Sequence, residues 1–106
     1  MAFKVHTITR YNYSFDARLN GPGSLQLWSD THKVLEITFV EDNAAVTAPT
    51  LAADLESAKA TFKSKALAGL VDMLRNESPV KVTINNQAPG FVYISAGLEA
   101  VGEGES

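Results

Sequence analysis

Residues 50–76 read TLAADLESAKATFKSKALAGLVDMLRN. Apolar side chains recur in this stretch at steps of three and four residues, namely Leu51, Leu55, Ala58, Phe62, Ala66, Leu70 and Met73. Such spacing places them on one side of a helix with 3.6 residues per turn. No other part of the chain shows this pattern, so the sequence predicts a single long helix over residues 50–76.

Residues that begin or stop helices mark the ends of this segment. Thr47 or Thr50 can accept a hydrogen bond from a backbone N–H at the N-terminus, and Pro49 is tolerated in a first helical turn. Ser78-Pro79 stops the helix, because the residue before a proline avoids the α region. Gly69, which weakens a helix interior, and the Ser64-Lys65 region are the positions where it could break, and we expect one continuous helix with at most a bend.

Short segments of strand type precede and follow the helix. In residues 3–15, apolar or aromatic side chains alternate with polar ones, which is the period of a β-strand. Further strands are predicted at 24–29, 34–40, 80–84 and 91–95, and residues 30–32 close a hairpin. The sequence therefore predicts an α+β fold of two layers. It is a mainly antiparallel five-stranded sheet, in the element order β-β-β-α-β-β, with one long helix packed on one face.

Composition agrees with one globular domain. The chain has 106 residues, of which 45% are hydrophobic and 20% charged, and we assign residues 1–97 to the domain and residues 98–106 to an acidic C-terminal tail. The absence of cysteine excludes disulfides and thiolate metal sites. No apolar run approaches the roughly 20 residues that cross a bilayer, so we expect no membrane partner and a cytoplasmic location.

A sheet covered by one helix has one covered and one open face. We expect the covered face to carry the core, formed by Leu25, Leu27, Leu35, Ile37, Phe39, Val80, Val82, Ile84, Val92 and Ile94. The alternation then places six large apolar side chains on the open face, namely Ile8, Trp28, Val34, Val40, Phe91 and Tyr93. An exposed apolar patch of this kind is typical of an interface. Two alternatives remain: the loop at residues 16–23 or the tail covers this face, or the strands curl into a half-barrel.

Residue groups that carry chemistry are scarce. The two histidines, His6 and His32, have no metal-ligand spacing, and Asp30-Thr31-His32 has the composition of a turn. Gly21-Pro22-Gly23-Ser24 leads into a strand, whereas phosphate-binding loops lead into a helix. We therefore predict no catalytic residues, no metal site and no cofactor.

These observations favour a small non-enzymatic interaction domain that forms a homodimer through the open aromatic face or an edge strand. One alternative is a small-ligand carrier with a pocket between helix and sheet, gated by residues 85–90. Another is single-stranded nucleic-acid binding, with Trp28, Phe91 and Tyr93 stacking on bases beside Lys4, Arg10 and Lys81. The net charge of −3 makes nucleic acid the least favoured partner.

Overall fold

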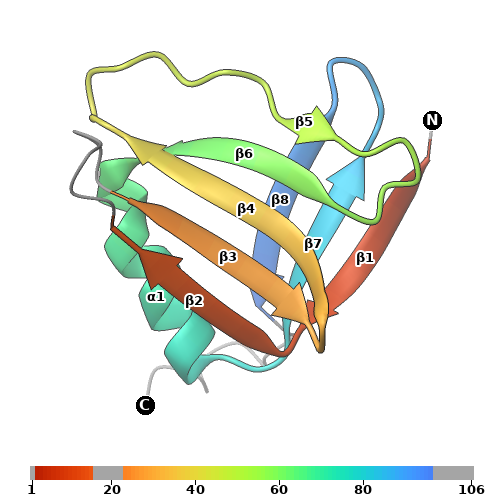
Figure 1. Cartoon of the computed structure of the whole chain (residues 1–106), viewed down its shortest axis with the longest axis horizontal. Coiled ribbons are helices and arrows are strands. Elements are labelled where there is room, and N and C mark those ends of the chain that lie inside the picture. Colours follow the sequence, from red (N-terminus) through yellow and green to blue (C-terminus); the bar gives the residue numbers. More distant parts are fainter. Residues whose placement is uncertain (1, 16–22, 97–106) are drawn as a thin grey trace, which may run out of the picture.

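Two β-sheets face each other in the computed structural model of the chain, which describes residues 2–15 and 23–96 (Figure 1). The first sheet is antiparallel and has three strands in the order β1 (Phe3–Ile8), β7 (Val80–Asn85) and β8 (Phe91–Ala96). The second has five strands in the order β2 (Arg10–Ser14), β3 (Ser24–Ser29), β4 (His32–Val40), β6 (Ala58–Lys63) and β5 (Thr50–Leu51). In the second sheet, β4 and β6 are parallel and the other pairs antiparallel. The prediction of an α+β fold is confirmed, but the single five-stranded sheet is wrong.

The helix is much shorter than the sequence pattern indicates. A 3-10 turn, η1 (Ser64–Ala66), leads into the only α-helix of the described residues, α1 (Leu67–Asn76). The helix ends before Ser78-Pro79 as predicted and continues through Gly69 without a break. The prediction is wrong for residues 50–63, which form β5, a turn and β6.

The reason for this error lies in β6. Ala58 and Phe62 fit a step of four residues in the longer helical pattern, but together with Ala60 they also alternate with polar residues at a step of two. In the structure β6 runs parallel to β4, and these three residues lie beside Leu35, Ile37 and Phe39. Ala58 and Ala60 are buried there, so the shorter period gives the correct assignment.

The predicted strand at residues 3–15 is divided at Thr9 between the two sheets. Its first half, β1, pairs with β7, and its second half, β2, pairs with β3. The Thr9 N–H donates to the carbonyl of Trp28 (2.8 Å), and its hydroxyl accepts from the N–H of Asp30 (2.7 Å). These bonds hold the crossing point against the β3–β4 hairpin.

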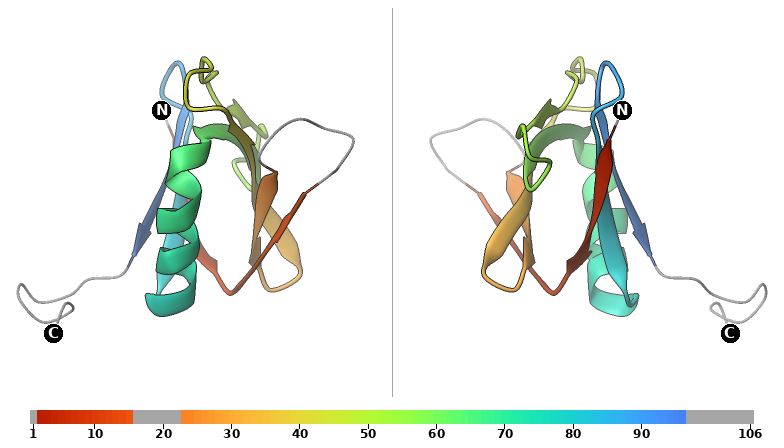
Figure 2. Two further views of the ribbon diagram at one scale, coloured as in Figure 1. Left: turned by 90° about the vertical axis from the view of Figure 1, so that its left-hand side faces the viewer. Right: turned by 90° about the vertical axis from the view of Figure 1, so that its right-hand side faces the viewer.

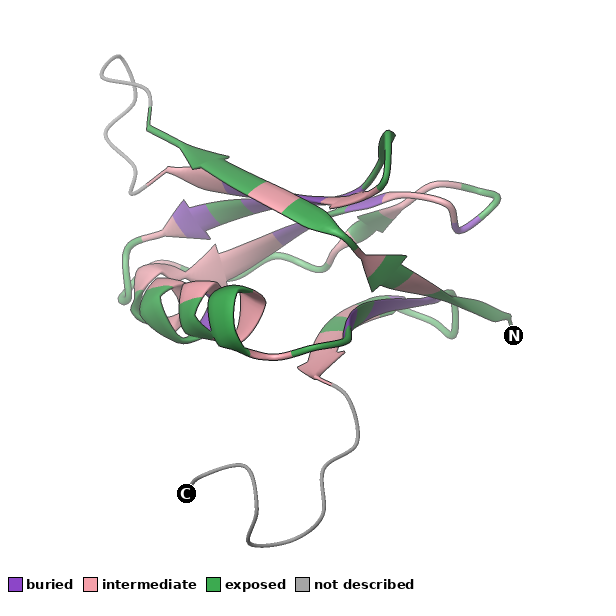
Figure 3. Cartoon of the chain, turned by 90° about the horizontal axis from the view of Figure 1, so that it is seen from below, coloured by how far each residue is buried: buried purple, intermediate pink, exposed green. Residues whose placement is uncertain are grey.

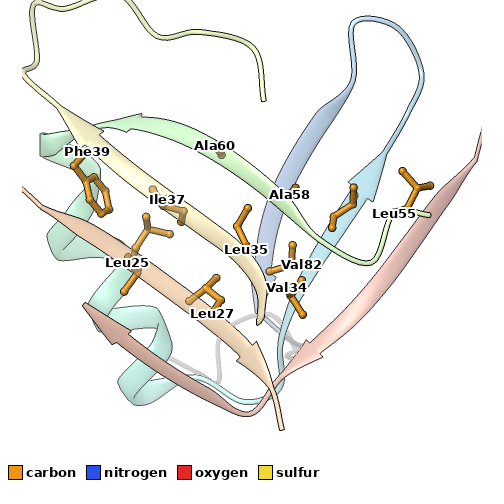
Figure 4. Packing of buried hydrophobic residues seen from close by; sticks show 12 residues of the cluster. Leu25, Leu27, Val34, Leu35, Ile37, Phe39, Leu55, Ala58, Ala60 and Val82 are labelled. Carbon is orange, nitrogen blue, oxygen red and sulfur yellow. The ribbon is translucent and has the colours of Figure 1, made fainter. Parts of the chain in front are cut away.

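The core lies between the two sheets (Figure 4). Its fully buried side chains come from β3, β4 and β7, and Figure 3 shows that these strands carry most of the buried residues. The predicted core residues are buried or pack against the core: Leu25, Leu27, Leu35, Ile37, Phe39, Val80, Val82 and Ile84 are buried, and Val92 and Ile94 are half-buried.

Val34 is an exception to the predicted alternation. The pairing of β3 with β4 shifts by one residue between Leu27 and Trp28, so Val34 is an extra residue on β4. As a result Val34 and Leu35 are adjacent in sequence and both fully buried. The prediction that Val34 points outward is therefore wrong.

Helix α1 lies in the same layer as β8 and faces the inner side of the five-stranded sheet, behind β2 and β3 in Figure 1 (Figures 1 and 2). It extends the layer of the three-stranded sheet, and Leu67, Leu70 and Leu74 pack against the shared core. This position leaves the outer face of the three-stranded sheet without a covering element among residues 2–15 and 23–96. No helix of the described chain is long and apolar enough to span a membrane.

Candidate functional site

The outer face of the three-stranded sheet carries the largest group of exposed apolar side chains on one sheet. Four residues of β1 and β8 form it, and we call them the aromatic face: Phe3 (59% exposed), Val5 (50%), Phe91 (39%) and Tyr93 (51%). Single exposed hydrophobic residues are normal, whereas a contiguous group usually marks a contact with another molecule.

The strand register brings these four side chains together. Phe3 and Phe91 lie on either side of Asn85, and Val5 and Tyr93 lie on either side of Thr83. The rings of Phe91 and Tyr93 stack at 6.0 Å between centroids with an interplanar angle of 15°. Thr83 and Asn85 are buried below them, although they point to the same outer side. The aromatic face is therefore a continuous apolar surface that covers two polar side chains.

The six residues predicted to form the interface do not lie on one surface. Phe91 and Tyr93 belong to the aromatic face, whereas Trp28 and Val40 alternate onto the outer side of the five-stranded sheet. Val34 is in the core. Ile8 pairs with Val80 and packs partly against the core, so the prediction that it points outward is also wrong.

Sequence reasoning missed Phe3 and Val5. Their alternation with Lys4 and His6 indicated two different faces of a strand but did not show which one meets the core. The side of β1 opposite Phe3 and Val5 carries Lys4 and His6, whose charged and polar side chains bind a loop instead of filling the core. This polar character was the signal available in the sequence.

That loop, residues 52–57, closes the side of the sandwich opposite α1. The His6 ring donates from Nε2 to the carbonyl of Leu55 (3.0 Å), and His32 donates from Nε2 to the carbonyl of Glu56 (2.6 Å). The Lys4 ammonium donates to the Glu56 carboxylate at 2.5 Å, and this hydrogen bond lowers the pKa of Glu56. Both imidazoles thus serve as donors to backbone carbonyls, which is a structural role.

The described residues contain no cluster of three or more side chains that could hold a metal ion.

Asp30 and Thr31 form the turn between β3 and β4, as predicted, and the Asp30 carbonyl accepts from the Arg10 guanidinium (3.0 and 2.6 Å). The same guanidinium lies 5.8 Å from the centre of the Trp28 ring. Trp28 also donates from Nε1 to Asn12 (2.8 Å), so its ring is held in a polar surface network.

This arrangement separates the residues considered for nucleic-acid stacking. Trp28 and Arg10 lie on the outer side of one sheet, whereas Phe91, Tyr93 and Lys81 lie on the outer side of the other. Lys4 is paired with Glu56. They do not form one stacking platform.

A second candidate surface is the groove between β2 and α1. Its larger pocket has a volume of about 540 Å³ and is lined by Tyr13 and Phe15 on one side and by Leu67, Ala68 and Val71 on the other. A second pocket of about 500 Å³ lies farther along the same strand and helix, beside Tyr11 and Leu74. We call these two pockets together the β2–α1 groove. The loop at residues 85–90, predicted to gate a pocket, lines neither of them.

The chain matches no protein-family model, no curated protein and no solved structure.

Proposed function

We propose that the protein is a small interaction domain that forms a homodimer through the aromatic face. The observation that carries this proposal is the exposure of Phe3, Val5, Phe91 and Tyr93, which are 39% to 59% exposed and adjacent in the sheet register. Leaving such side chains in water is unfavourable, and their burial against an apolar surface would be the main source of binding energy.

The area of the aromatic face fits the centre of a dimer interface. A fully buried aromatic side chain removes 150–250 Å² from water, so three half-exposed rings offer about 300 Å² and Val5 adds about 50 Å². Two copies would then bury about 700 Å² through these side chains alone. Because a stable interface buries about 1,200–2,000 Å² in total, the remaining area would come from the rim.

A second copy is a suitable partner because the centre of this face carries no charge. The nearest charged residue of the three strands' outer side is Lys81, which lies between Thr7 and Ser95 at the end of the face. A twofold axis through the centre would therefore bring aromatic rings together without placing like charges opposite each other. Twofold dimers are also the most common assembly of soluble proteins.

Sedimentation equilibrium on the full chain over a range of concentrations tests this proposal. We expect a monomer–dimer equilibrium with a dissociation constant in the micromolar range, and a weakening of roughly a hundredfold in the double variant Phe91→Thr, Tyr93→Thr. Threonine keeps the preference for a β-strand but removes both rings. Circular dichroism would show whether the variant keeps its fold.

Trp28→Phe is the matched control, because it changes an aromatic residue on the outer side of the other sheet. We expect it to leave the dissociation constant unchanged. A chain that stays monomeric at high micromolar concentration contradicts the proposal, and so does a dimer that the double variant does not weaken.

A further inference from the structure

Strand β2 has an open edge. Among the described residues it is hydrogen-bonded only to β3, so one row of its backbone groups has no strand partner. The N–H of Phe39 donates to the carbonyl of Gly23 (3.0 Å), which shows that odd-numbered residues of β3 bond to β4. The backbone groups of even-numbered residues of β3 therefore bond to even-numbered residues of β2, such as Asn12. The N–H and C=O groups of Tyr11 and Tyr13 point instead to the open edge.

Helix α1 extends beyond this edge. Ala68, Val71, Asp72 and Arg75 recur at steps of three and four residues, so they form one stripe along the helix. All four line the larger pocket of the β2–α1 groove opposite Tyr13 and Phe15, and Val71 is the most covered of them. An additional strand next to β2 would lie over this stripe, since a sheet and a helix pack as adjacent layers.

The groove carries one cation that is free within the described residues. Arg75 makes no hydrogen bond or ion pair with any residue of 2–15 or 23–96, and it lies in the last turn of α1. The carboxylate of Asp72, its neighbour on the stripe, accepts from the Asn76 side-chain amide (2.8 Å). A carboxylate placed opposite Arg75 would make a charge-assisted pair with this free guanidinium.

We propose that the β2–α1 groove binds an extended peptide that adds as a sixth strand to the open edge of β2. Its backbone bonds to Tyr11 and Tyr13, and alternate side chains point inward to the two pockets. The inward side chains are apolar where they meet Tyr13 and Val71, and one inward carboxylate meets Arg75. This site lies apart from the aromatic face and does not depend on the proposed dimer.

Fluorescence anisotropy with a designed peptide tests this site on the full chain. The probe is fluorescein-labelled Thr-Val-Thr-Val-Thr-Val-Thr-Glu, in which every second residue can point inward and the last carries the carboxylate. We expect saturable binding in the micromolar range. Two matched peptides separate the contributions: one has lysine in place of glutamate, and the other is N-methylated at alternate residues so that one backbone edge cannot donate.

The peptides and protein variants should give a consistent pattern. N-methylation on the docking edge abolishes binding, and the lysine peptide and Arg75→Gln each weaken it by roughly tenfold. Lys81→Gln is the control, because it removes the same charge from the exposed outer side of the three-stranded sheet. Far-UV circular dichroism would show whether both variants keep their fold.

Three results would overturn the proposal. The first is no saturable binding of the glutamate peptide. The second is binding that is insensitive both to N-methylation and to Arg75→Gln. The third is dissociation of a homodimer by the peptide in sedimentation velocity, which would make a second copy of the chain the natural occupant of the groove.

Discussion

Asp42 connects the loop after β4 to the start of the helical segment. Its carboxylate accepts hydrogen bonds from the Ser64 hydroxyl (3.0 Å) and from the Lys65 N–H (2.9 Å). The N–H groups of a first helical turn have no partner within the helix, so this carboxylate satisfies one of them. The bond from the Lys65 backbone, followed by that from Ser64, lowers the pKa of Asp42 from its ordinary value of 3.8.

This lowered pKa predicts the direction of an effect of pH. A carboxyl whose pKa is lower in the folded state stabilises the fold above its unfolded pKa of 3.8, and this contribution disappears as pH falls through the folded value. We therefore expect Asp42→Ala to lower the melting temperature at pH 7, with a gap to the native chain that narrows below pH 3.8. Thermal unfolding monitored by circular dichroism from pH 7 to pH 2 measures this difference in melting temperature.

Asp42→Asn is the control, because asparagine keeps the accepting oxygen but does not titrate. The difference in melting temperature between the asparagine and alanine variants should not depend on pH. A gap between the native chain and Asp42→Ala that is equally large at pH 7 and pH 2 would show that the charge of Asp42 has no part in stability.

Leu55 combines a buried side chain with a backbone conformation that favours glycine. Its side chain is 5% exposed, and its φ is 61°, in the left-handed region. Leu55→Ala should lower the free energy of unfolding by about 2–5 kcal/mol through the lost contacts and the cavity. Leu55→Gly should be no less stable than the alanine variant, because glycine adopts this φ without strain. Urea denaturation measures the free energy of unfolding of both variants. An alanine variant that is clearly more stable than the glycine variant contradicts the argument.

At the scale of the elements, the sequence predicted strands more reliably than the helix. The strands at 24–29, 34–40, 80–84 and 91–95 all lie where the structure has strands, because their apolar residues alternate and turn residues separate them. Residues 58–63 match a strand and a helix equally well. Pairing with β4 decides between them, and a contact between distant segments cannot be derived from local spacing.

Gly69 tests the part of the helix that does form. It lies inside α1, is exposed, and a Cβ added to it would have no atom within 4 Å. Gly69→Ala should therefore raise the free energy of unfolding by about 0.5–1 kcal/mol, because alanine loses less backbone entropy on folding. Urea denaturation measures this gain. A loss of stability would mean that this turn of the helix contacts something that the glycine accommodates.

At the scale of the whole molecule, the crossing at Thr9 explains why the candidate site was only partly predicted. Most apolar or aromatic residues on both sides of Thr9 are odd-numbered, yet Val5 points outward in β1 and Tyr11 points to the core in β2. The inward direction reverses because the two halves belong to sheets that face each other. The alternation alone predicted two faces of one strand, so Phe91 and Tyr93 were identified while their neighbours on β1 were not.

The shared core makes a final prediction about how the two sheets unfold. Ile84 of the three-stranded sheet is fully buried in the same cluster as Leu25 and Ile37 of the five-stranded sheet. Ile84→Ala should therefore lower the free energy of unfolding by about 2–5 kcal/mol for both sheets together. Hydrogen exchange measures this directly: the most protected amides of β3 and β7 should lose protection by the same factor. Thr7→Ala, an exposed change on β1, is the control. A loss of protection that is confined to the amides of β7 would show that the sheets unfold as separate units.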